Sequence, residues 1–144
     1  MSSPKKFIVD KCNSYHLDSE FTQVHIARHI PDMTGSDSRS IMIETLRSLL
    51  TIAYSLTDKR LKMIVISVMF KFMIEYDGII NEILKSPYFM NVIVNKLVEF
   101  SAERELGLQI IGEDFLKNET TYFKNILSEN NHHKMVNLLE DTLT

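Results

Sequence analysis

The sequence predicts an all-α fold, and three patterns carry that prediction. Residues 63–74 contain only two polar side chains, Ser67 and Lys71. A helix that is apolar on all its faces must be surrounded by other helices or by lipid, and this run is shorter than the roughly 20 residues that a bilayer requires. Helix-capping residues recur on both sides of it, and no alternation of apolar and polar residues lasts longer than four positions. We therefore expect roughly six or seven helices around a buried central helix at residues 58–76.

The N-terminal residues form a more mixed segment. One helix is predicted over Glu20–Ile30 from residues at helical spacing, namely Phe21, Val24, Ala27 and Arg28. Residues 31–38 combine Pro, Gly and several capping types, and they form the strongest helix-breaking stretch of the chain. We expect an N-terminal segment at residues 1–38 and a helical core at residues 39–144, together forming one compact domain.

Capping residues then mark where each helix of the core begins. Ser40 is expected to cap a helix that ends near Ser55, with an apolar stripe of Ile43, Leu46, Leu49, Leu50 and Ala53. Thr57, followed by Asp58, is expected to cap the central helix, and Asp77-Gly78 to end it. The further predicted helices are Ile79–Lys85, a helix from Pro87 to Phe100 capped by Ser86, a helix from Ser101 to Lys117, one from Glu119, and a last one capped by Asn130 or Asn131.

A weak internal repeat accompanies these helices. Residues 78–101 read GIINEILKSPYFMNVIVNKLVEFS, and a similar pattern returns 42 residues later, where Val94 pairs with Val136 and Leu97 with Leu139. A glycine opening, a short helix, a Ser-Pro turn and a longer helix resemble an armadillo or HEAT unit. The resemblance implies stacked helix pairs that present a surface to a partner protein. The small residue frequent in the long helix of that family is missing, since Val94 and Asn95 occupy the region.

The apolar central helix supports a second arrangement. A buried helix surrounded by amphipathic ones is similar to the Bcl-2 fold, including its viral members. The Asn-Trp-Gly-Arg stretch of that family is absent, and the chain contains no Trp. Stacked helix pairs and a closed bundle therefore remain open alternatives.

Four residues near the N-terminus form a candidate zinc site. Cys12, His16, His25 and His29 follow the spacing C-x3-H-x8-H-x3-H. Two histidines at positions i and i+4 lie on one face of a helix, and four nitrogen or sulfur ligands suit tetrahedral zinc. Zinc is the only cofactor that the sequence indicates. The alternative interpretation is a buried cysteine beside a polar helix face.

Composition indicates which partners and which cellular compartment are favoured. The chain has 144 residues, a net charge of −3 and one cysteine. This charge does not favour nucleic acid or an anionic membrane as a partner, and a single cysteine forms no intrachain disulfide, which fits a reducing compartment. The first apolar run, Phe7-Ile8-Val9, is too short for a secretory signal. We expect an intracellular protein of the cytoplasm or nucleus.

No sequence motif indicates catalysis. A nucleophile elbow and a glycine-rich phosphate loop are both missing, and the clustered carboxylates have basic neighbours, as on a solvated face. We therefore expect a non-enzymatic protein-interaction module, an adaptor or regulator, with a homodimer as an open alternative. Aromatic residues at helix beginnings and a basic helix start are its candidate contacts: Tyr88, Phe89, Tyr122, Phe123, Lys59 and Arg60. The alternative function is a zinc-stapled helical protein that binds nucleic acid or a transcription complex.

Overall fold

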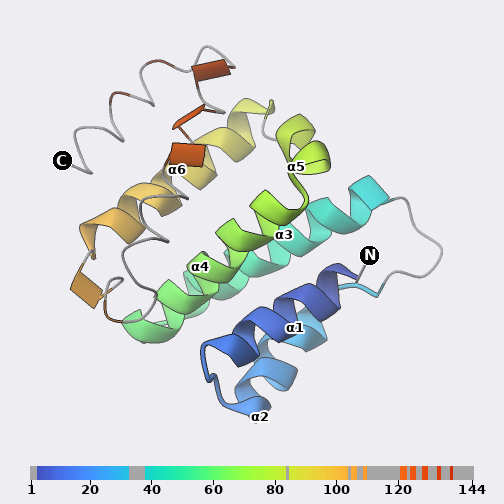
Figure 1. Ribbon diagram of the computed structural model, residues 1–144. Coiled ribbons are helices and arrows are strands. Elements are labelled where there is room, and N and C mark those ends of the chain that lie inside the picture. The colour runs from blue at the N-terminus through green and yellow to red at the C-terminus, as the bar shows by residue number, and fades with distance from the viewer. Residues whose placement is uncertain are drawn as a thin grey trace. The chain divides into compact units, whose positions relative to one another are not determined.

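The computed structural model describes residues 3–32, 38–83 and 85–103, with single residues and pairs between 105 and 137 (Figure 1). Within these residues every regular element is a helix, which confirms the all-α prediction. The predicted number of helices stays a prediction, as do the armadillo, HEAT and Bcl-2 arrangements. The helices expected after Ser101 lie largely outside the described residues.

The chain divides into two compact units, Met1–Ile79 and Ile80–Thr144. The expected boundary after residue 38 falls inside the first unit, because the N-terminal helices pack against the helices that follow them. The first unit therefore has its own apolar centre, to which both the N-terminal segment and the central helix contribute.

The first helix, α1 (Pro4–Ser14), was not predicted from the sequence. Ser3 caps it by accepting a hydrogen bond from the Lys6 amide at 3.2 Å, and Pro4 occupies the first turn, where a missing N–H costs nothing. Its buried residues are Pro4, Ile8 and Cys12, one per turn, and this face packs against α4. A stripe of one residue per turn explains why the apolar periodicity of α1 is weak.

The C-terminal end of α1 is held by a residue in the left-handed conformation. His16 has φ 56°, which among the described residues is the only positive φ outside glycine. The amide of His16 donates to the Asn13 carbonyl at 3.0 Å, and that of Leu17 donates to the Cys12 carbonyl at 3.3 Å. These bonds satisfy carbonyls that the helix end would leave unpaired, at a position where glycine is usually found.

Replacing His16 by glycine is expected to raise the free energy of unfolding by about 0.5–1 kcal/mol, because glycine adopts the left-handed region without a Cβ clash. Urea unfolding measures the change. The control is Lys6→Gly, which introduces the same residue at an exposed right-handed position of α1 and should destabilise by up to about 1 kcal/mol. A loss of stability in His16→Gly would contradict the role given to this turn.

The segment that follows contains three types of helix in succession. Asp18 accepts hydrogen bonds from the amides of Glu20 at 2.8 Å and Phe21 at 3.2 Å. The chain then forms α2 (Ser19–Phe21), a π-helix η1 (Thr22–Ile26) and a 3-10 helix η2 (Ala27–His29). The predicted helix over Glu20–Ile30 is therefore helical but not a regular α-helix.

The burial pattern explains the π-helix. The buried residues are Thr22, Ile26, Ala27 and Ile30, which are spaced i, i+4, i+5 and i+8. An α-helical stripe has the spacing i, i+3, i+4 and i+7, so this segment carries one extra residue, and the wider i→i+5 turn absorbs it. Of the residues at helical spacing from which this helix was predicted, Val24 and Arg28 are exposed and Ala27 is buried.

The two long helices of the first unit are α3 (Ser38–Ser55) and α4 (Lys59–Glu75). Because α3 begins at Ser38, Ser40 lies inside the helix and is not its cap, contrary to the prediction. The stripe is also rotated from the expected one: Ile43 and Leu50 are only half-buried. The buried residues of α3 are Ile41, Met42, Thr45, Leu46, Leu49, Ile52 and Ala53.

The central helix α4 confirms the predicted buried helix. Its cap is Asp58 and not Thr57 as predicted, because the Asp58 side chain accepts a hydrogen bond from the Leu61 amide at 3.0 Å. Both α1 and α3 pack against it (Figure 1), and the hydroxyls of Tyr15 and Ser67 share a hydrogen bond of 2.9 Å that pairs the buried serine. The buried residues of α4 are Met63, Ile64, Val65, Ile66, Ser67, Val68, Met69, Phe70, Phe72 and Met73.

The bounds predicted for the next two helices agree with those of the structure to within two residues. The central helix ends at Glu75, and Gly78 lies inside α5 (Asp77–Ile83) rather than at a helix end. Helix α6 (Pro87–Ala102) begins at the predicted Ser-Pro step, where the Met90 amide donates to the Ser86 carbonyl at 3.0 Å. It continues through Ser101, so the expected cap at that residue was wrong.

Candidate functional site

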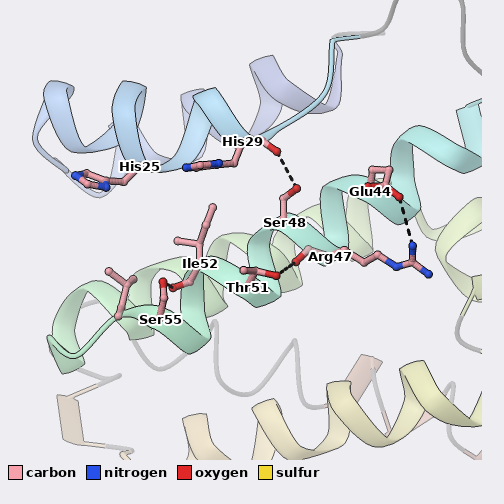
Figure 2. Close-up of a pocket in the computed structure, with 9 residues that line it drawn as sticks. His25, His29, Glu44, Arg47, Ser48, Thr51, Ile52 and Ser55 are labelled. Carbon is pink, nitrogen blue, oxygen red and sulfur yellow. Dashed lines mark hydrogen bonds and ion pairs between the residues drawn. The ribbon is translucent and has the colours of Figure 1, made fainter.

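A groove of about 470 Å³ runs between the η1–η2 segment and α3, both in the first unit (Figure 2). Ser48 joins its two walls, because its hydroxyl donates to the main-chain carbonyl of His29 at 2.8 Å. The volume lies within the range of ligand-binding clefts. The residues that line it are His25, His29, Glu44, Arg47, Ser48, Thr51, Ile52, Ser55 and Leu56.

Two histidines form one wall of the groove. His25 comes from the π-helix and His29 from the 3-10 helix, and Figure 2 shows both imidazole rings on the side that faces α3. Both residues are exposed. The ring of Phe21 contacts that of His25 with the centroids 5.3 Å apart, which limits the movement of this imidazole. The wall therefore presents two ring edges to whatever enters the groove.

Three hydroxyl groups on α3 line the opposite wall. Besides Ser48, the Thr51 hydroxyl donates to the Arg47 carbonyl at 2.9 Å, and the Ser55 hydroxyl donates to the Ile52 carbonyl at 2.9 Å. A hydroxyl has one proton and two acceptor lone pairs. Because the three protons are used by main-chain carbonyls, this wall offers acceptors rather than donors.

A charged pair lies toward the N-terminal end of the same wall. The Arg47 guanidinium is 3.4 Å from the Glu44 carboxylate, one turn earlier on α3, and both side chains are largely exposed. Such a surface pair contributes little to stability, at most about 1 kcal/mol. Its charges nonetheless largely cancel each other at this end of the groove.

The four candidate zinc ligands are placed in three different settings. Cys12 is fully buried in α1, His16 is exposed at the turn after α1, and His25 and His29 face the groove. In the described part of the chain, no three His, Cys, Asp or Glu side chains lie together as metal ligands would. The structure thus brings His25 and His29 onto one wall, and the four-ligand zinc site stays a prediction that elemental analysis of purified protein tests.

Burial raises the pKa of the Cys12 thiol from its ordinary 9.0 to about 12. Since the thiolate is the reactive form, we expect no labelling of native protein by a thiol reagent near neutral pH, and rapid labelling after unfolding. The unfolded chain also releases this proton at lower pH than the folded chain. The thiol's contribution to stability is therefore complete below pH 9.0 and is lost as the pH rises toward 12.

Urea unfolding of wild type and Cys12→Ala at several alkaline pH values isolates that contribution, because all other titrating groups are shared. The wild type should lose more stability with rising pH than the variant. Native labelling as fast as that of an unfolded control would show instead that the thiol is accessible.

The candidate partner contacts lie in both units. Tyr88 is 69% exposed on α6, whereas Phe89, whose ring centroid is 5.6 Å away, is buried. Tyr122 is half-buried, and Phe123 lies outside the described residues. Lys59 and Arg60 are exposed in the first turn of α4. Lys59 and Arg60 belong to the first unit and Tyr88 and Phe89 to the second, so they stay separate candidates.

One pattern in the sequence relates to the groove. Glu44, Ser48, Thr51 and Ser55 recur every three or four residues, so they form a polar stripe on one face of α3. Such a stripe is ordinary on a solvated helix. Its meaning depends on the histidine segment packing beside it, and the spacing does not reveal that packing.

No protein-family model, curated protein or solved structure matches this chain. In the described residues there is also no helix with the length and apolar character needed to cross a membrane.

Proposed function

We propose that the protein is a non-enzymatic interaction module, an adaptor or regulator, that binds a partner protein in the groove between η1–η2 and α3. The observation that carries the proposal is the polar groove, together with an exposed aromatic residue on the helix that forms one of its walls. Tyr54 is 80% exposed on α3. It follows Thr51 by three residues and Arg47 by seven, so it lies beside these two lining residues on the helix surface.

The surroundings of the groove favour a protein as its occupant. Tyrosine is enriched in protein interfaces, where its ring packs while its hydroxyl stays hydrated. The groove lining also contains two apolar residues, the buried Ile52 and the half-buried Leu56. Polar and apolar side chains thus line the same groove, an arrangement suited to a peptide segment.

Site-specific photo-crosslinking tests the proposal. A crosslinking amino acid at Thr51 should capture a defined partner from a lysate of the source organism, and the same group at Arg60, exposed on α4, serves as control. Tyr54→Ala should weaken binding of that partner about tenfold or more, as truncation of an anchoring interface tyrosine does. Tyr88→Ala is the matched control, since it removes another largely exposed ring, from α6.

Other outcomes would redirect the proposal. Loss of the partner in Tyr88→Ala but not in Tyr54→Ala would place the interface at the helix-start aromatics expected from the sequence. Capture of a second copy of this chain, with a dimer mass by light scattering, would identify a homodimer. Turnover of a substrate by the purified protein, abolished by changes in the groove, would contradict a non-enzymatic role.

A further inference from the structure

We draw no further inference here: the strongest candidate, the side-chain pair His25 and His29 on one wall of the groove between η1–η2 and α3, belongs to the site already described, and among the residues that the structure describes no third His, Cys, Asp or Glu side chain joins the pair as a metal ligand would.

Discussion

Replacing Ile66 by Asp is expected to unfold the protein or to lower its free energy of unfolding by about 3–5 kcal/mol. Ile66 has no exposed surface, and the residues around it on α4 are buried as well. A carboxylate there loses its hydration and gains no positive partner, and that penalty is a large part of the 5–15 kcal/mol by which a domain is typically stable. Far-UV circular dichroism and a thermal melt measure the effect.

Arg60→Asp is the matched control, because it introduces the same side chain into the first, exposed turn of the same helix. A negative charge near a helix N-terminus is favourable, so this variant should be as stable as the wild type or slightly more stable. Val68→Asp should behave like Ile66→Asp, since Val68 is equally buried. A melting temperature of Ile66→Asp within about 2 °C of wild type would contradict the burial of α4.

Phe72→Ala is expected to cost about 3–5 kcal/mol. Phe72 is fully buried, and its ring lies 6.3 Å from that of Phe7 on α1 and 5.0 Å from that of Tyr76 at the end of α4. Removing it leaves a cavity where α1 meets α4 and removes two aromatic contacts. Chemical denaturation gives the change in free energy, provided that the slope of the transition is unchanged.

A double-mutant cycle separates the free energy of the aromatic contact from the free-energy cost of the cavity. Phe72→Leu keeps most of the volume and should cost less than Phe72→Ala. Combined with Phe7→Leu, it should give a coupling energy of about 0.5–1.5 kcal/mol if the two rings interact directly. Strict additivity of the two changes would mean that the two rings stabilise the protein through their buried area alone, with no direct interaction between them.

The parts of the fold that depend on local signals were predictable. The apolar composition of residues 63–74 defines α4, and the Ser86-Pro87 step defines the start of α6. Helix α1 was missed because its stripe of Pro4, Ile8 and Cys12 is only one residue wide. Its burial depends on α4 providing a complementary face, which periodicity within α1 does not encode.

Only part of the candidate site could be predicted from the sequence, for a related reason. His25 and His29 stand out in the sequence, but their spacing is compatible with a metal site, a polar face and a binding wall. The choice depends on their neighbour, and that neighbour is α3, 19 residues away at the Ser48–His29 hydrogen bond. The acceptor character of Ser48, Thr51 and Ser55 depends in turn on which carbonyls receive their protons.

Because the π-helix contains one extra residue, the direction of the histidine side chains in this groove depends on the number of residues in the segment. Without exposed Gln23, the buried residues Thr22, Ile26, Ala27 and Ile30 would fall on the spacing of an ordinary α-helix and could keep their places. At about 100° per residue, both imidazoles would then point away from that buried stripe. Deleting this one residue would thus leave the net charge and the buried residues unchanged but would alter the direction of the two histidine side chains. We therefore expect relatives of this chain to differ in which residue stands at position 23 more often than in whether a residue is present there.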